Sequence, residues 1–376
     1  MAEYKTLVKK IPISPDKKTK QKDYLKKGQL PIVDQGQSLV GGYTDDANMT
    51  VECELPVIVF GDHTRAVKYI TFPFGAGADG IKVLQPKENI LPPFLYYGTQ
   101  YIVAKMPNRG YARHYQYVEK EDLPVPSLPE QERIVARIEE LFSQLDAGVE
   151  TLKKTKAQLA VYRQAVLKEA FESVIPESDT CNVEDVCKDI KVGIVIKPAQ
   201  YYTSADVGVR AFRSANVREF AVNDSDWVYL TKAGHEANLR SEIHTGDVLV
   251  VRSGYPGTAC VVPPTYNGCN AIDILIAVPY AEKILPEYLC AYTNSPLGKR
   301  IIQEKKRGVA QAHFNVSGYS KTPIIVPCLE TQKRVVAEID SRLSVCDSIE
   351  QTVDKALQQA EAMRQSILKD AFEGRL

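Results

Sequence analysis

A stretch of 46 residues occurs twice in this chain, at an offset of 201 residues and without a gap. Residues 128–173 align with residues 329–374, and 18 of the 46 aligned positions are identical. Self-similarity at a fixed spacing indicates a duplicated structural unit. The chain is therefore expected to fold as two related halves.

Both copies are predicted to be single long helices. After the first turn neither contains a proline, and both are rich in Ala, Leu, Glu, Lys, Gln and Arg, which favour helix. Pro129, followed by Glu130 and Glu132, is typical of a helix start. At ~1.5 Å per residue each copy would form a rod of roughly 69 Å.

Apolar residues recur along both helices at alternating spacings of four and three, from Ile134 to Val166 and from Val335 to Ile367. This heptad seam is typical of a coiled coil, and the long segment between the copies permits them to pair antiparallel. Gly148, Thr155 and Arg342 interrupt the seam, so further partners could pack there. A coiled coil that only dimerises the protein is the alternative interpretation.

The segments that precede the two helices also resemble each other. Residues 88–95 (ENILPPFL) parallel residues 282–289 (EKILPEYL), and both are predicted to begin a short helix. The remainder consists of β-branched and aromatic runs broken by Gly, Pro, Asn and Asp, a pattern typical of strands joined by turns. The sequence therefore predicts an α+β fold, pseudo-twofold, in which two domains alternate with two long helices forming an antiparallel coiled coil. In chain order the four parts are residues 1–127, 128–173, 174–327 and 328–376.

Charge excludes one class of function. The 47 basic and 47 acidic residues cancel, which argues against a protein that binds nucleic acid through bulk attraction alone. Local clusters remain: residues 1–27 hold nine Lys against three acidic residues, and a second cluster lies within residues 299–307. Such clusters suit phosphate contacts or, equally, a solvated face. The second cluster consists of Lys299, Arg300, Lys305, Lys306 and Arg307.

Export and membrane insertion are not predicted. The first 20 residues lack an apolar core, and the apolar stretch at residues 271–281 is short and contains Asp273, so we expect a cytoplasmic protein. The eight cysteines form no Cys-x-x-Cys pair, so free thiols are expected and a zinc site is not.

No catalytic constellation is found in the sequence. Residues 75–80 (GAGADG) fit G-x-G-x-x-G, but the β-branched, proline-broken stretch that follows does not suit the helix that a dinucleotide site requires, so a turn is predicted. Signatures of ATP-binding loops, zinc proteases and serine hydrolases are missing. We expect no catalytic residue and no metal site, and a self-contained enzyme is disfavoured.

Each predicted domain instead carries polar, planar and basic side chains on turns between strands, where a rigid scaffold can present them to base edges. Arginine can bind guanine O6 and N7, glutamine and asparagine can pair with adenine, and serine or lysine can hold phosphates. For each residue alone, an ordinary surface loop position is the alternative. The DNA-binding candidates are Gln35, Gln37, Asp62, His63, Thr64, Arg65 and Lys68 in the first domain and Arg210, Arg213, Ser214, Asn216, Arg218, Arg252, Ser253 and Tyr255 in the second.

With these residues in view, the layout resembles the specificity subunits of type I restriction-modification systems over nearly the whole chain. The most specific parts are the helices, with LPEQERIVARIEELFSQLD and VYRQAVLKEAFES in the first and ETQKRVVAEID and AMRQSILKDAFEGRL in the second. The stretches GQLPIVDQGQSLVGGYTDD, LPVIVFGDHTR and GADGIKVL are similar to one type of target-recognition domain. Another type is matched by GVRAFRSANV and GDVLVVRSGYPG.

The resemblance implies a non-catalytic subunit whose two target-recognition domains each read one half of a bipartite DNA site, while the antiparallel helices fix the distance between the halves. It implies as partners double-stranded DNA, two methyltransferase subunits that use S-adenosylmethionine to methylate adenine, and endonuclease/translocase subunits that use ATP and Mg²⁺. No cofactor is then expected in this chain. The Lys-rich start departs from the family pattern, so the first domain could be a shortened form. The alternatives are a coiled-coil assembly scaffold and, within the family, a subunit of a methyltransferase without an endonuclease or a spare copy for domain shuffling.

Overall fold

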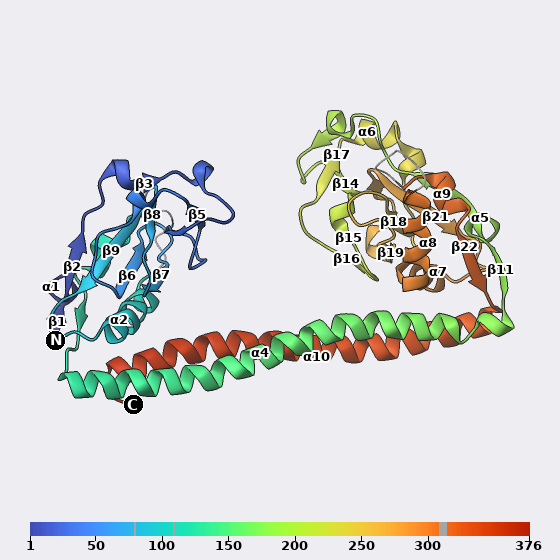
Figure 1. Ribbon diagram of the computed structural model, residues 1–376. Coiled ribbons are helices and arrows are strands. Elements are labelled where there is room, and N and C mark those ends of the chain that lie inside the picture. Colours follow the sequence, from blue (N-terminus) through green and yellow to red (C-terminus); the bar gives the residue numbers. More distant parts are fainter. Residues whose placement is uncertain (79, 108–109, 111, 308–313) are drawn as a thin grey trace. The chain divides into compact units, whose positions relative to one another are not determined.

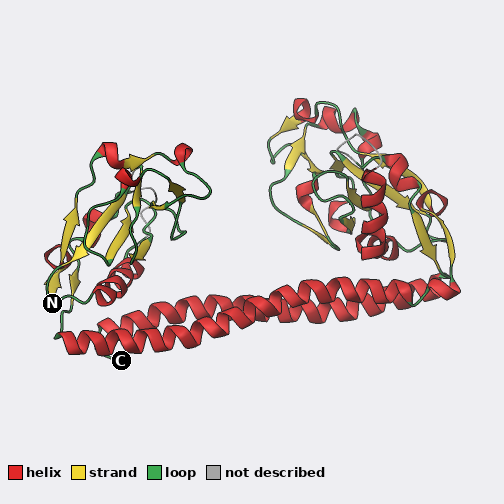
Figure 2. Cartoon of the chain, in the orientation of Figure 1, coloured by secondary structure: helices red, strands yellow, loops and turns green. Residues whose placement is uncertain are grey.

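The computed structural model describes residues 1–78, 80–107, 110, 112–307 and 314–376, except for the side chains of residues 177 and 305–307. The described chain divides into two compact units, residues 1–153 with 354–376 and residues 154–353. Each unit holds one α+β domain together with one part of each long helix (Figures 1 and 2). Each long helix is thus divided between the two units. The sequence analysis instead treats each helix as a part of its own, and that division into four consecutive segments remains a prediction.

The two long helices are continuous. Helix α4 spans Leu128–Glu172 and helix α10 spans Leu329–Phe372, where the duplicated sequence predicts helix. The start of α4 pairs with the end of α10 in the first unit, where Arg364 forms an ion pair with Asp146. The end of α4 pairs with the start of α10 in the second, where Arg163 Nη2 lies 2.6 Å from Asp347 Oδ1. The predicted antiparallel pairing is therefore confirmed.

One detail of the predicted seam is wrong. The seam includes positions 148 and 162 of the first helix and their repeats, yet Tyr162 is 45 % exposed, Ile349 41 % and Met363 54 %, and Gly148 is also exposed. Tyr162 still touches the other helix, because its hydroxyl accepts a hydrogen bond from Arg342, whose guanidinium lies 5.5 Å from the Tyr162 ring centroid. The seam is therefore exposed to solvent at the same two positions in both copies, while Leu159 and Val166 further along it are buried.

In the first unit, two four-stranded sheets build the domain. The first is antiparallel in the order β2-β9-β6-β7, and the second, in the order β3-β8-β4-β5, contains two parallel pairings. Helix α2 (Pro92–Lys105) packs against β6 and β7. The strands are β1 (Ala2–Glu3), β2 (Val8–Ile11), β3 (Lys18–Thr19), β4 (Leu30–Val33), β5 (Gly42–Thr44), β6 (Val57–Gly61), β7 (Val67–Ile70), β8 (Gly75–Gly77), β9 (Ile81–Pro86) and β10 (Asp122–Leu123), with short helices α1 (Tyr4–Leu7) and α3 (Tyr115–Val118).

The second unit repeats this plan. Its antiparallel sheet has the order β12-β21-β18-β19, and a second sheet, β13-β17-β14-β20, again contains one parallel pairing. Helix α7 (Pro286–Asn294) takes the place of α2. The strands are β11 (Asp179–Asn182), β12 (Cys187–Val192), β13 (Tyr202–Thr203), β14 (Val209–Phe212), β15 (Val217–Arg218), β16 (Ala221–Val222), β17 (Val228–Leu230), β18 (Val248–Val251), β19 (Ala259–Val261), β20 (Asn270–Ala271), β21 (Ile274–Pro279) and β22 (Pro323–Val326), with α5 (Val183–Val186), α6 (Lys232–Glu236), α8 (Pro296–Arg307) and α9 (Val316–Ser320).

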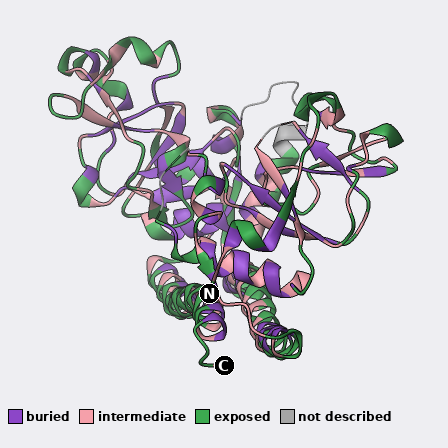
Figure 3. Cartoon of the chain, turned by 90° about the vertical axis from the view of Figure 1, so that its left-hand side faces the viewer, coloured by how far each residue is buried: buried purple, intermediate pink, exposed green. Residues whose placement is uncertain are grey.

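Each domain shares a hydrophobic core with its part of the helix pair. Phe372 at the end of α10 lies 5.1 Å, between ring centroids, from Phe94 of α2. The repeated Phe171 at the end of α4 lies 5.2 Å from Tyr288 of α7. Such aromatic contacts bury large apolar areas, so the identical ends of the two helices anchor them to their domains. Buried residues concentrate in the domains, while the outer faces of the helices are exposed (Figure 3).

Candidate nucleic-acid interface

In the first unit, two loops with predicted DNA-binding residues lie against each other. The Thr64 hydroxyl donates a hydrogen bond to the backbone oxygen of Gln35, and the space beside Gly80 is closed by the Gln35 amide and the His63 ring. Gly80 has a φ of +78°, and an added Cβ would lie 2.5 Å from Gln35 Oε1. Glycine is needed here for both reasons, so the loops after β4, after β6 and before β9 form one surface.

Two predicted residues of this surface are internal supports. Lys68 is 4 % exposed and donates a hydrogen bond of 2.7 Å to the backbone oxygen of Asp34, and its burial lowers the pKa of its ammonium group. Asp62 is also 4 % exposed, and its carboxylate accepts a 2.8 Å hydrogen bond from the Tyr115 backbone. These contacts hold the loops in place, so we expect neither side chain to reach DNA itself.

The remaining candidates of the first unit are better placed. Gln37 and Thr64 are exposed and His63 and Arg65 half-buried. Arg65 has a φ of +60°, which turns the loop sharply. The Gln35 side-chain oxygen is buried without a hydrogen-bond partner in the part of the chain that the structure describes. A buried acceptor without a donor is costly, and a base amino group could satisfy it only once the loop opens.

In the second unit, the stretch around Asn216 is a tight structural turn. Asn216 is fully buried, and its amide donates to the backbone oxygens of Asn223 and Ser225 at 3.2 and 2.8 Å. Its side-chain oxygen accepts from the Arg213 backbone at 3.0 Å. Arg213 also donates to the backbone of Asp226. The sequence indicates a polar turn correctly, but these contacts leave the Asn216 side chain no group for a base.

Two further arginines are partly engaged within the second unit. The Arg210 guanidinium lies 5.6 Å from the ring centroid of Trp227 and 5.9 Å from that of Tyr266. Arg252 forms an ion pair of 3.1 Å with Asp273. Ser214 and Ser253 are half-buried on the same stretches as their neighbouring arginines.

An open groove of about 660 Å³ brings together predicted residues from separate stretches of the second unit. Arg218 is the last residue of β15, and Tyr255, which is 85 % exposed, projects from the loop between β18 and β19. Lys299 and Gln303 of α8 complete the groove, and Lys299 pairs with Glu219. Two cations, an amide and an exposed ring suit a phosphate backbone and the bases beside it.

The sequence interpretation missed part of this groove. Gln303 and Thr258 line it but lack any local signal, because helix α8 is brought to the β18–β19 loop only by folding. Lys299 had a sequence signal, because it belongs to the basic cluster at residues 299–307 that suits phosphate contacts. The side chains of Lys305, Lys306 and Arg307 lie outside those that the structure describes.

The glycine-rich motif at residues 75–80 can be compared with the structure. Strand β9, and not a helix, follows Gly75–Gly80, so the geometry of a dinucleotide-binding turn is missing from this motif. Within the described residues no cluster of His, Cys, Asp and Glu could hold a metal ion. No described helix is both long enough and apolar enough to cross a membrane.

Two α+β domains display polar loops, and each is joined to one part of a duplicated antiparallel helix pair, which defines a modular, duplicated protein. Comparison with known proteins gives a family match for part of the chain. Residues 10–160 match the family model described as the type I restriction modification DNA specificity domain. Over these residues the chain is similar to type I restriction-modification specificity subunits.

Relatives extend the similarity beyond the matched domain. The EcoBI specificity subunit of Escherichia coli is 25 % identical over 90 % of this chain and 74 % of its own length. The EcoR124I/EcoR124II specificity subunit of Escherichia coli is 24 % identical over 90 % of this chain and 85 % of its own. The EcoKI specificity subunit of Escherichia coli K12 is 25 % identical over 68 % of this chain and 58 % of its own length.

Solved structures share the fold. A chain from a study of complex assembly and conformational transition of the type I restriction-modification system aligns with a TM-score of 0.71 at 16 % identity, covering 100 % of this chain and 97 % of that one. The HsdS subunit of Thermoanaerobacter tengcongensis aligns with a TM-score of 0.51 at 17 % identity, covering 100 % and 96 %.

Proposed function

We propose that this chain is the specificity subunit of a type I restriction-modification complex and that each of its units reads one half of a bipartite DNA site. The observation that carries the proposal is the duplicated anchoring of two polar-looped domains to one helix pair, in a chain that is similar to type I specificity subunits. Two equivalent readers fixed to one rod are what recognition of a split sequence requires, because each half-site then meets its own domain.

In the second unit, the groove beside Tyr255 is the proposed contact surface. Lys299 would hold a phosphate, and Arg218, exposed at the mouth, could reach the guanine edge in the major groove. Tyr255 would lie against a sugar or base. Glu219 neutralises Lys299 in the free protein, so DNA would have to displace this carboxylate.

In the first unit, the surface formed by Gln35, Gln37, Thr64 and Arg65 is the proposed counterpart. The orphaned Gln35 oxygen gains a donor when the loop opens and an adenine or cytosine amino group approaches. Lys68 and Asp62 support the loops from beneath. Different side chains on the two units imply different half-sites.

The chemistry is proposed to belong to partner subunits. Two methyltransferase subunits would supply S-adenosylmethionine and methylate adenine in the site, and endonuclease/translocase subunits would use ATP and Mg²⁺. This chain would contribute no catalytic group and bind no cofactor, and the complex would act on DNA in the cytoplasm. A coiled-coil scaffold that binds no DNA is the rival function.

A map of methylated adenines in cells with and without this chain tests the proposal. Loss of one split motif on deletion is expected, whereas an unchanged methylation map would contradict it. A block exchange of residues 30–80 with a relative's segment should change only one half of the motif. A scaffold would tolerate the exchange without any change in the methylated sequence, so this second experiment separates the two functions.

A further inference from the structure

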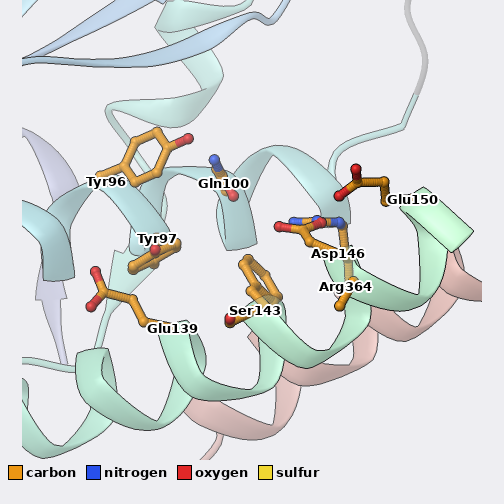
Figure 4. A pocket seen from close by; sticks show the side chains of 10 residues that line it. Tyr96, Tyr97, Gln100, Glu139, Ser143, Asp146, Glu150 and Arg364 are labelled. Carbon is orange, nitrogen blue, oxygen red and sulfur yellow. The ribbon is translucent and has the colours of Figure 1, made fainter.

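A cavity of about 600 Å³ lies in the first unit, where helix α2 faces the long helices (Figure 4). Tyr96 and Tyr97 line it from α2, and Glu139 and Phe142 from α4. The proposed DNA-contacting residues do not line it. The cavity is therefore a separate site within this unit.

The lining is predominantly acidic. Glu139, Asp146 and Glu150 contribute three carboxylates against the single guanidinium of Arg364. A phosphate group would be repelled by this excess of negative charge, so DNA does not suit the cavity. A positively charged group suits it.

The guanidinium of Arg364 already shows how this cavity can hold a cation. Arg364 lies 4.7 Å from the ring centroid of Phe142 and pairs with Asp146, which combines cation–π attraction with an ion pair. At the other end of the cavity, Glu139 lies beside Tyr97 (Figure 4). The same two kinds of group, a ring and a carboxylate, are thus present a second time.

This second set has room for an occupant. The rings of Tyr96 and Tyr97 lie 5.1 Å apart, between centroids, and both face the same open space as Glu139. The Glu139 carboxylate interacts with the Tyr97 hydroxyl and forms no ion pair in the part of the chain that the structure describes. A planar guanidinium can stack on a ring while it donates two hydrogen bonds to one carboxylate, which a lysine cannot do.

The equivalent position in the second unit is closed. Asp340 repeats Glu139 at the offset of 201, and Cys290 and Ala291 stand where Tyr96 and Tyr97 stand in the first unit. The cavity there measures only about 150 Å³, and Phe220 lines it. Burial raises the pKa of the Asp340 carboxyl. The second cavity also has a ring and carboxylates, Phe220 with Glu287 and Asp340, but the larger space and the two tyrosine rings beside the carboxylate occur in the first unit.

We propose that the cavity of the first unit binds an arginine side chain of a partner protein, with the guanidinium stacked on Tyr96 or Tyr97 and paired with Glu139. Free arginine suits the cavity less well, because its own carboxylate would meet the acidic lining. The site does not depend on DNA recognition. It makes the two halves of the chain unequal toward protein partners although their helices are repeated.

Titration of the full chain with N-acetyl-arginine amide, followed by calorimetry or NMR, tests the proposal. N-acetyl-citrulline amide serves as the neutral probe of the same shape. We expect the arginine probe to bind at least fivefold more tightly than the citrulline probe and than free arginine. Glu139→Gln should weaken its binding at least fivefold, whereas the matched variant Asp340→Asn in the second unit should leave it unchanged.

Because Glu139 is exposed, its replacement leaves the fold intact, which thermal unfolding can verify. Tyr96→Leu provides a second variant that removes a stacking ring and should also weaken the arginine probe. Equal binding of arginine and citrulline probes, undetectable binding of both, or unchanged binding by Glu139→Gln would each overturn the proposal. Tighter binding of free arginine would assign the site to the amino acid and also overturn it. A DNA-binding assay of Glu139→Gln, expected to be unchanged, keeps this result separate from the proposed function.

Discussion

Gln332 makes the same three hydrogen bonds in the second unit that Gln131, 201 residues earlier, makes in the first. Both amides are fully buried. Each accepts from a leucine N–H that begins helix α2 or α7 and donates to two backbone oxygens. One side chain thus ties the start of each long helix to the helix of its domain and to the turn that precedes it.

Replacing Gln332 with leucine should be among the most destabilising single changes in the second unit. The volume is kept, but the Leu285 N–H and the oxygens of Lys283 and Pro327 lose their partner in a buried place. We expect a loss of about 3 kcal/mol in unfolding free energy, the cost of unsatisfied buried groups. Urea denaturation followed by circular dichroism measures it.

The control for this prediction is Gln351→Leu, which changes an exposed position of α10 and should alter stability by less than about 0.5 kcal/mol. Gln131→Leu should reproduce the effect of Gln332→Leu in the first unit. If both buried variants behaved like the exposed control, the amides would not anchor the helices.

A repeated ion pair crosses between the helices as well, because Arg364–Asp146 in the first unit and Arg163–Asp347 in the second occupy the same repeat positions. The four side chains are between 24 % and 60 % exposed, so solvent screens them. A double-mutant cycle with Arg364→Ala and Asp146→Ala should give a coupling energy of at most about 1 kcal/mol. A coupling of several kcal/mol would show that these pairs, and not the apolar seam, hold the helices together.

The sequence predicted the features that follow from local patterns and from repetition. Internal repetition, helix propensity and heptad spacing gave both long helices and their pairing, and broken β-branched runs gave α+β domains. The seam positions at Tyr162 and Met363 are exposed, because heptad spacing identifies the side of a helix that faces its partner but not how far each side chain on it is covered. At the site, the polar character of a turn was visible in the sequence, but the direction of each side chain was not. Asn216 and Lys68 turn inward, while Gln303 joins the groove from a distant helix.

Thiol chemistry should distinguish the exposed Cys328 from the inner cysteines, of which Cys53 and Cys181 are half-buried and the other five are buried. Cys328 is exposed, and hydrogen bonds with Thr331 lower the pKa of its thiol. Burial raises the pKa of Cys260 to about 12. Because the thiolate is the reactive form, Ellman's reagent should modify Cys328 first in the native protein. Cys328→Ser should abolish the fast phase, and a fast phase that survived would mean that an inner cysteine is accessible.

Alkaline pH should destabilise the fold in a defined window. Burial raises the pKa of Tyr115 and of Tyr292 from 10.0 to about 12. Between these values the unfolded chain has released protons that the folded chain retains, so stability is fully present below pH 10.0 and falls as the pH rises toward 12. Urea midpoints at increasing pH, with phenolate absorbance, measure the decline. Tyr115→Phe should make it shallower, while Tyr255→Phe, a change at an exposed ring, should not alter its slope.

The groove of the second unit yields the most direct test of DNA contact. Arg218→Ala should weaken binding to the cognate site by about 1 to 3 kcal/mol and relax selectivity at one base pair, if this arginine reads a guanine. Lys299→Ala should instead weaken binding to all sequences alike and reduce the slope of log affinity against log salt by about 1. Glu219→Gln removes the carboxylate that neutralises Lys299 and should tighten binding.

Asn216→Ala is the contrasting variant: its side chain is buried, so it should lower stability without changing the methylated sequence. Fluorescence anisotropy with the assembled complex at several salt concentrations measures binding by the other three variants, and thermal unfolding with a methylation map checks Asn216→Ala. Tighter binding by Lys299→Ala or weaker binding by Glu219→Gln would place the DNA elsewhere.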